Sequence, residues 1–323
     1  MNLETDRPNA DMAAAATSSR TPLTAERFVP SWRRFKGLAI FAAVLIVVFA
    51  RPLFLLLTFA PHAELYAHIL LIPFICGYLI WTKREEFVPE SKPNRLLALL
   101  PLVAGAAVLI GYRIALGIGW TFEKPDYLAV MTFAFLCFLL VGAFLFVGAS
   151  YLKSITFPVA FLFFMVPFPQ AWRDGIEAFL QHGSADVAYL MLKLSGMPVY
   201  RTDTHFKMPG FSLMVAPECS GIHSTLILLI TSLMAAYLFL RTPVRRWVFV
   251  AAVIPLALLR NGFRVFTLGQ LGVHIGPQIL DSWLHHHGGI LFFLLSLVPL
   301  FLLLFYFIKS ESRKEQTIAV QPK

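Results

Sequence analysis

The chain has 323 residues, of which 58% are hydrophobic and only 14% are charged, and its mean hydropathy is +0.72. These values exclude an ordinary soluble globular domain and indicate an all-α, polytopic membrane helix bundle. The net charge of +9 fits cytoplasmic loops rich in Lys and Arg, and no basic stripe with interleaved aromatics suggests a nucleic-acid partner.

The N-terminal segment, residues 1–36, is polar and contains an alanine-rich stretch, which predicts a disordered cytoplasmic tail. The first apolar run begins near Gly37, too far from Met1 for an ordinary signal peptide, and many further runs follow it. The chain therefore divides into this tail, a multi-span membrane domain over residues 37–308 and a second cytoplasmic tail over residues 309–323.

A membrane-spanning helix needs about 20 mostly apolar residues. Runs of this kind predict about eight spans, at roughly 37–59, 63–82, 95–116, 127–147, 153–169, 219–240, 246–269 and 287–308. The first run contains Arg51 and Pro52, and a proline ends or kinks a helix because it lacks the backbone N–H. We expect the first span to end early or to bend there.

Residues 172–197 form a weaker segment, in which charged residues interrupt a helical periodicity. This pattern fits either an amphipathic helix in the membrane interface or a poor ninth span. The choice matters, because one additional span would reverse the side on which every later segment lies.

Most of the 27 Lys and Arg residues lie in the two tails and in alternate loops, so the positive-inside rule places both termini in the cytoplasm. Three polar positions then fall at the outer ends of the last three spans. Cys219 begins the sixth span, Arg264 lies near the end of the seventh, and His285 precedes the eighth. This topology predicts that polar groups from three helices converge at the outer face.

Cys219 lies in the stretch Pro-Glu-Cys-Ser-Gly-Ile-His-Ser, whereas Cys76 and Cys137 lie inside apolar runs, where cysteine is usually a small packing residue. The free N–H groups and the dipole at a helix start favour an anion, so a thiolate is plausible there. A thiolate is a nucleophile that forms covalent acyl intermediates. The alternative is that Cys219 only packs at the start of its helix.

The residues next to Cys219 are candidates for catalysis or for simpler structural roles. His223 is one helical turn away, which makes it a candidate base or an interfacial histidine. Glu218 is a candidate helix cap, Ser220 adds a hydroxyl group, and Gly221 permits the close approach of another helix or of a substrate backbone.

Arg260 and Arg264 lie four residues apart on one face of the predicted seventh span. A cation inside the membrane costs free energy and is therefore a candidate for function. The alternative is that the long side chain extends toward the lipid headgroups. Arg260 is the better candidate for such an extended side chain or for a structural partner. Asn261 can orient a neighbouring group through a hydrogen bond.

Three consecutive histidines, His285, His286 and His287, suggest a metal site at first sight. Adjacent residues on a helix point about 100° apart, however, so the three side chains cannot share one ion in a regular helix. No His-Glu-x-x-His motif and no paired Cys-x-x-Cys motif occurs. We expect no metal and no cofactor, with His285 as a catalytic histidine and the other two as bystanders or alternative bases.

Together, these stretches resemble the exosortase/archaeosortase family of integral membrane cysteine transpeptidases. The family has Cys-Ser-Gly at the start of one span, Asn-x-x-Arg near the end of the next, and a His four residues before a Gly-x-x-Phe that opens the last. The same order is found here as Cys219 to Gly221, Asn261 to Arg264, and His285 before Gly289 to Phe292. The resemblance covers most of residues 60–308.

The resemblance implies a catalytic triad of Cys219, Arg264 and His285. The thiolate would attack a peptide carbonyl, the histidine would protonate the leaving amine, and the arginine would stabilise the oxyanion or the thiolate. The family often has arginine where this chain has His223, which keeps this histidine as a supporting candidate.

The partners that the resemblance implies are exported proteins with a C-terminal sorting signal, an acceptor nucleophile and membrane lipid. The signal is a Pro-Glu-Pro-like motif followed by a transmembrane helix and basic residues. The location it implies is the inner (cytoplasmic) membrane, with the active site at the outer face.

Three other functions compete with this one. A transporter or flippase would line a pathway with intramembrane Arg and His, although no inverted repeat is evident. A membrane metalloenzyme would use the run from His285 to His287. A non-catalytic assembly protein would present its outer loop to a partner.

Overall fold

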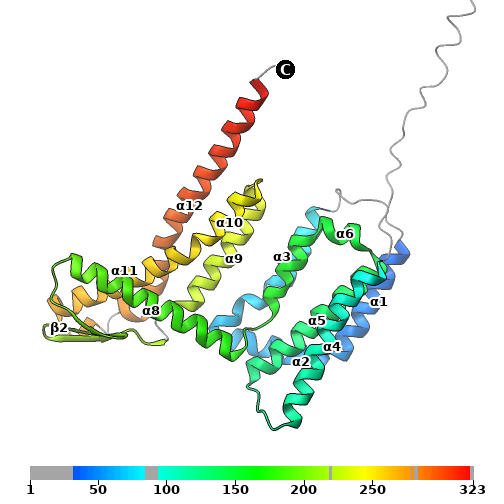
Figure 1. Ribbon diagram of the computed structural model, residues 1–323, viewed down its shortest axis with the longest axis horizontal. Helices are drawn as coiled ribbons and strands as arrows, with labels where there is room; N and C mark the ends of the chain where they lie inside the picture. Colours follow the sequence, from blue (N-terminus) through cyan, green and yellow to red (C-terminus); the bar gives the residue numbers. More distant parts are fainter. Residues whose placement is uncertain (1–31, 84–93, 218–219, 277, 280–282, 321–323) are drawn as a thin grey trace, which may run out of the picture.

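The computed structural model describes residues 32–83, 94–217, 220–276, 278–279 and 283–320 (Figure 1). The first half of the chain forms α1 (Trp32–Val48), α2 (Ala50–Phe59), the 3-10 helices η1 (Ala60–His62) and η2 (Glu64–Leu70), α3 (Ile72–Thr82), α4 (Arg95–Gly117), α5 (Lys124–Phe146), α6 (Ala149–Ser154), α7 (Thr156–Leu162) and the 3-10 helix η4 (Phe163–Met165).

The second half forms α8 (Gln170–Leu194), β1 (Tyr200–Thr202), β2 (His205–Met208), β3 (Phe211–Met214), α9 (Ile222–Phe239), α10 (Pro243–Ala251), α11 (Val253–Ile275) and the 38-residue α12 (Trp283–Val320). The upper end of the molecule is the end where α1 starts and α12 finishes, and the lower end carries the strands (Figure 1).

Within the residues that the structure describes, six helices are long and apolar enough to cross a membrane, and the all-α polytopic bundle is therefore confirmed. They are Glu64–Thr82, Arg95–Gly117, Lys124–Phe146, Ile222–Phe239, Pro243–Ile275 and Gly288–Arg313. A pair of helices, Phe35–Val48 and Ala50–His62, makes a seventh candidate with a bend of 74°. The expected eight spans are thus reduced to six or seven among the described residues.

The bend in the first pair has a local cause that the sequence predicted. Pro52 has no N–H to donate to the carbonyl of Val48, four residues earlier, so one helical hydrogen bond is missing at this point. The helix breaks at Phe49, directly between these two residues. The expectation of an early end or a kink in the first span is confirmed.

The predicted span at 153–169 is not a single long helix. The chain breaks at Ile155 between α6 and α7, and the apolar helix that follows covers only Thr156–Met165, which is too short to be counted among the spanning helices. Pro158, in the first turn of α7, favours a new helix start at this point because proline fits the first turn of a helix best and kinks or breaks a helix farther along.

The weak segment at 172–197 is helical over its greater part, as α8, but α8 is not among the helices apolar enough to span a membrane. Figure 1 shows α8 running beside α11 along the lower part of the molecule, at a clear angle to α12. The two helices approach closely through small residues, since a Cβ atom on Gly262 would lie 2.5 Å from the Val187 side chain, and one on Gly183 would lie 2.9 Å from that of Leu258.

The three strands form an antiparallel sheet in the order β1-β2-β3. Alternate residues of a strand point to opposite faces, and here Phe206, Met208, Phe211 and Leu213 are buried against α8 and α11. The intervening residues of β2 and β3 are exposed. The sheet is thereby fixed to the α8–α11 pair and positions the segment that follows β3.

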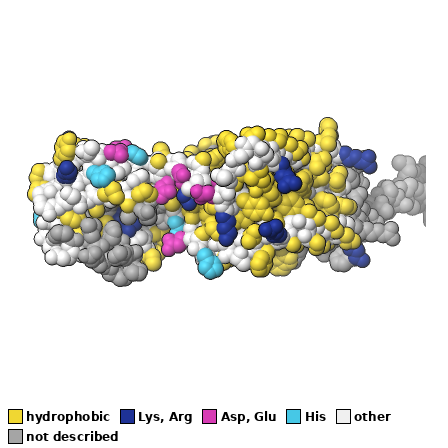
Figure 2. All heavy atoms as spheres, turned by 90° about the horizontal axis from the view of Figure 1, so that it is seen from below, with side chains coloured by type: hydrophobic (Ala, Val, Ile, Leu, Met, Phe, Trp, Pro, Cys, Tyr) yellow, Lys and Arg dark blue, Asp and Glu magenta, His cyan; other side chains and the backbone are white. Residues whose placement is uncertain are grey.

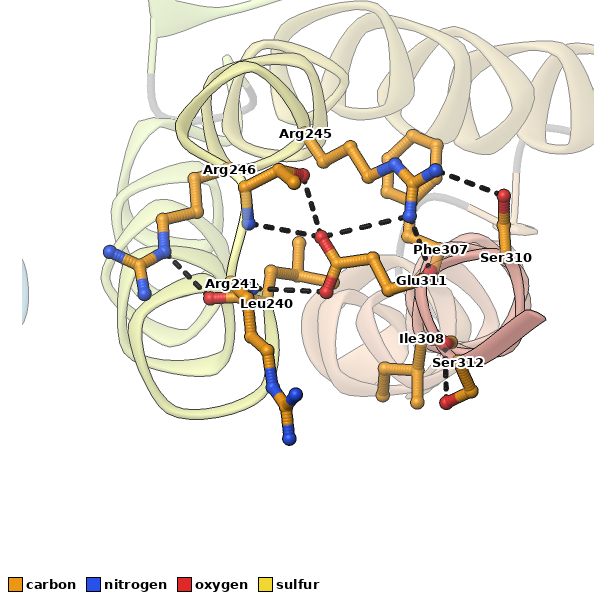
Figure 3. Close-up of polar contacts among 10 residues, drawn as sticks. Leu240, Arg241, Arg245, Arg246, Phe307, Ile308, Ser310, Glu311 and Ser312 are labelled. Atoms are coloured by element: carbon orange, nitrogen blue, oxygen red, sulfur yellow. Dashed lines mark hydrogen bonds and ion pairs between the residues drawn. The ribbon is translucent and has the colours of Figure 1, made fainter. Parts of the chain in front are cut away.

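Hydrogen bonds and an ion pair connect the upper end of α12 to the segment between α9 and α10 (Figure 3). The Glu311 carboxylate accepts hydrogen bonds from the backbone N–H groups of Arg241 and Thr242, both at 3.0 Å, and from the Thr242 hydroxyl at 2.6 Å. Arg245 lies 3.6 Å from the same carboxylate and also donates to the Phe307 carbonyl at 3.2 Å. Glu311 is buried, so these contacts replace the water that it loses.

Candidate active site

The segment from Val215 to Gly221 joins β3 to α9 at the lower end of the molecule. Its first residue is held on both sides: the Val215 N–H donates to the Thr204 carbonyl at 3.0 Å, and the Gln181 side chain of α8 donates to the Val215 carbonyl at 2.5 Å. The Ser220 N–H donates to the Pro217 carbonyl at 3.0 Å. Glu218 and Cys219 lie outside the described residues, but the chain is anchored before and after them.

The residues after Cys219 are bound to α11. The Asn261 side chain donates to the Ser220 carbonyl at 3.2 Å, and the Arg260 guanidinium donates to the Gly221 carbonyl and to the Thr225 hydroxyl, both at 3.3 Å. Ser220, Arg260 and Asn261 are all buried. Buried hydrogen bonds to carbonyls are strong because no water competes for them, so this contact fixes the start of α9 against α11.

Gly221 is required in this arrangement for two reasons. Its φ of 76° lies in the left-handed region, which costs a residue with a side chain about 1 kcal/mol or more. A Cβ atom at this position would lie only 2.8 Å from an Arg260 guanidinium nitrogen and 3.4 Å from the Asn261 side-chain oxygen. The close approach expected of this glycine is therefore made to the two polar residues of α11.

The Gly221 carbonyl is also the first acceptor of α9. It receives the Thr225 N–H at 2.9 Å, the Thr225 hydroxyl at 2.8 Å and the Ser224 hydroxyl at 3.1 Å. Together with Arg260, these donors surround one carbonyl oxygen. The first turn of α9 is therefore tightly defined directly after Cys219.

Arg264 lies one helical turn after Arg260 on α11. Its half-buried side chain lines a small cavity with Asn261, Val215 and Leu213, so it faces the segment that leads to Cys219. Arg260 instead forms the hydrogen bonds to Gly221 and Thr225 described above. The structure thus separates two arginines that sequence spacing placed on one face: Arg260 is a structural partner, and Arg264 lies beside the strand end.

His223 occupies the first turn of α9 and is half-buried. His68 lies in η2, which contacts α9, and it lines a cavity together with Phe164. His68 was not among the residues predicted from the sequence, although it is a histidine next to an apolar run. Nor was Gln181, whose contact with Val215 depends on the fold.

The remaining candidate residues have no described side chains. His285, His286 and His287 belong to the first turns of α12, at the lower end of the molecule, but their side chains lie outside the described residues. The triad of Cys219, Arg264 and His285 therefore stays a prediction. In the part of the chain that the structure describes, no group of three or more His, Cys, Asp or Glu residues could hold a metal ion.

Figure 2 shows the lower face, with acidic and histidine side chains over its middle and left parts and mainly hydrophobic side chains on the right. The two halves of the molecule therefore differ at this face. The half with α8 and the sheet presents polar groups, as expected of a surface that meets water.

A family model described as transmembrane exosortase matches residues 60–302, which is most of the chain. No curated protein and no solved structure matches the chain. The matched range contains both α9 and α11, with the polar contacts between them.

Proposed function

Since the chain belongs to the transmembrane exosortase family, we propose that it is a membrane-embedded cysteine transpeptidase. In this proposal it cleaves a C-terminal sorting signal from exported proteins and transfers them to an acceptor through an acyl-enzyme. The nucleophile is Cys219, with Arg264 and His285 as its catalytic partners.

The observation that carries the proposal is the contact between the start of α9 and α11. Ser220 and Gly221, directly after Cys219, are hydrogen-bonded to Asn261 and Arg260, and Arg264 follows one turn later on the same helix. A nucleophile and an oxyanion-stabilising cation need fixed relative positions, because a misplacement of about 1 Å costs about a hundredfold in rate. These contacts supply such a fixed frame.

The proposed reaction has two steps. The Cys219 thiolate attacks the scissile carbonyl carbon, and Arg264 stabilises the negative charge that develops on the carbonyl oxygen. The C–N bond then breaks, His285 gives its proton to the leaving amine, and a thioester remains on Cys219. In the second step His285 accepts the proton of the acceptor nucleophile, which attacks the thioester and releases the thiolate.

A membrane-embedded enzyme suits a substrate that carries its own anchor. The transmembrane helix of the sorting signal would hold the cleavage motif at a fixed depth, and this raises the effective concentration at the active site. With the N- and C-termini in the cytoplasm, as the distribution of basic residues favours, the lower end faces outward from the inner membrane. Exported proteins would then meet the enzyme after translocation.

The test is processing of a co-expressed reporter that ends in a Pro-Glu-Pro motif, an apolar helix and an arginine cluster. We expect Cys219→Ala to leave the reporter at full length, and Cys137→Ala, which alters a buried cysteine of α5, to leave processing intact. Wild-type protein should also yield a hydroxylamine-sensitive adduct between the reporter and Cys219. Normal processing by the Cys219→Ala variant would refute the proposed function.

A further inference from the structure

A cavity of about 520 Å³ lies between the two halves of the molecule. One wall comes from the end of α3 and from α6 and α7, and the other comes from α9 and α10. Because α3 and α9 end and α10 begins at the upper end in Figure 1, this cavity lies far from the segment around Gly221. Its volume is in the range of pockets that hold a small molecule.

Three cations line this cavity: Lys83, Lys153 and Arg246. No Asp or Glu among the described residues lines it. Cations grouped around one cavity repel each other, and an anion that binds between them relieves this repulsion. A lining of this charge favours an anionic occupant over a cationic one.

Aromatic contacts fix the positions of two of these cations. The Tyr237 ring stacks on Phe157, with centroids 3.8 Å apart and planes 5° apart. The Lys83 ammonium lies 5.4 Å from the centre of the Tyr237 ring, and the Arg246 guanidinium lies 5.7 Å from it. The Arg246 Nε donates to the Leu240 carbonyl at 2.7 Å, and Figure 3 shows its other two nitrogens pointing away from the Glu311 cluster.

The rest of the wall is apolar, with Phe161, Phe164, Leu233 and Val250 among its residues. Trp247 also lines the cavity and is 73% exposed, so the cavity rim continues onto the outer apolar surface of the bundle. Tryptophan is enriched where a membrane meets water. An occupant that matches this wall has an apolar chain as well as a negative charge.

We propose that this cavity binds an anionic phospholipid, with its phosphate among Lys83, Lys153 and Arg246 and an acyl chain along the aromatic wall. Basic pockets between transmembrane helices are known to bind acidic lipid headgroups. A free phosphate would leave the apolar wall without a partner. The arginine cluster of a sorting signal is excluded by its charge, so this site is separate from the one that would process substrates.

The test uses the purified full-length protein and native mass spectrometry, with phosphatidylglycerol and phosphatidylcholine as the two lipid probes. We expect the wild type to retain phosphatidylglycerol in preference to phosphatidylcholine. Removal of all three cations in Lys83→Gln/Lys153→Gln/Arg246→Gln should weaken phosphatidylglycerol binding by roughly a hundredfold at low salt, since each basic residue contributes about a fivefold factor.

The matched control is Lys309→Gln, because Lys309 is an exposed lysine at the upper end that does not line the cavity. It should bind phosphatidylglycerol as the wild type does. Lys153→Glu, at an exposed position, tests the site without disturbing the stacked rings, and it should weaken binding by about tenfold. Equal retention of the two lipids by wild type, unchanged binding by Lys153→Glu, or full displacement of the lipid by inorganic phosphate would overturn the proposal.

Discussion

The two ends of α9 lie in opposite kinds of environment. At its lower end the Gly221 carbonyl is surrounded by donors, and the neighbouring Arg260 is buried and directed at the protein itself. At its upper end, next to Tyr237, two lysines and an arginine line an open cavity. A buried cation that binds a backbone carbonyl serves the fold, whereas the cations at the upper end line a cavity large enough for a ligand. This difference agrees with our proposals, which place the chemistry at the lower end and lipid binding at the upper end.

The largest expected effect separates the two candidate bases at the lower end. His285→Ala should lower the rate of reporter processing by about a hundredfold to ten-thousandfold, because a general acid–base group contributes on this scale. His223→Ala should change the rate only a few-fold. The measurement is the initial rate of processing at matched protein levels, and an inverted result would transfer the base to His223.

The second prediction concerns the two arginines of α11. Arg264→Gln should lower the processing rate by about a hundredfold or more, since one oxyanion donor contributes this much. Arg260→Gln should lower the stability by about 1–3 kcal/mol, because the Gly221 carbonyl and the Thr225 hydroxyl lose a buried donor. Thermal unfolding in detergent, followed with the processing rate, distinguishes the two. Equal loss of rate and stability in both variants would remove the distinction between them.

The third prediction tests the geometry at Gly221. Gly221→Ala should destabilise the protein by about 2 kcal/mol, from the left-handed backbone and from the clash with Arg260, and should reduce processing as well. The control is Gly111→Ala in α4, where a Cβ atom meets nothing within 4 Å. This control should be neutral or slightly stabilising, because alanine favours a helix more than glycine does. A tolerated Gly221→Ala would show that the start of α9 is not tightly held.

The smallest effect is expected at the upper end. Glu311→Gln should lower the stability by about 1–2 kcal/mol, because an amide accepts fewer of the hydrogen bonds from Arg241 and Thr242. The processing rate of the folded protein should stay unchanged. Ser312→Ala is the control, since the Ser312 hydroxyl donates to the Ile308 carbonyl of its own helix. A selective loss of processing in Glu311→Gln would connect the upper end to the chemistry.

Hydrophobic runs and single prolines predicted much of the fold. The bend before Pro52 follows from one missing N–H, and the polytopic bundle follows from the length of the apolar runs. The run at 153–169 was apolar enough for a span, but apolarity alone does not show that a helix is continuous through Ile155. Composition therefore predicted the membrane class better than it predicted the number of spans.

The candidate site was less predictable, because the spacing of residues along the sequence does not show which distant elements are in contact. Arg260 and Arg264 are equivalent by helical periodicity, and only the position of Gly221 separates them. The contact between Gln181 and Val215 joins residues 34 positions apart, and that between Glu311 and Thr242 joins residues 69 positions apart. The upper cavity is lined by residues from the end of α3 and from α6, α7, η4, α9 and α10, so no short motif could indicate it.

The length of α12 has a mechanical consequence. Its 38 residues extend over about 57 Å, well beyond the hydrocarbon thickness of a bilayer, and they join the backbone around His285 to the cluster at Glu311. In a rigid helix of this length, a tilt at one end of the helix would move its other end at the opposite membrane surface. Pro299 lies between the two ends, where a missing hydrogen bond makes bending easier. We therefore expect Pro299 to be the point at which α12 bends most easily when its two ends move relative to each other.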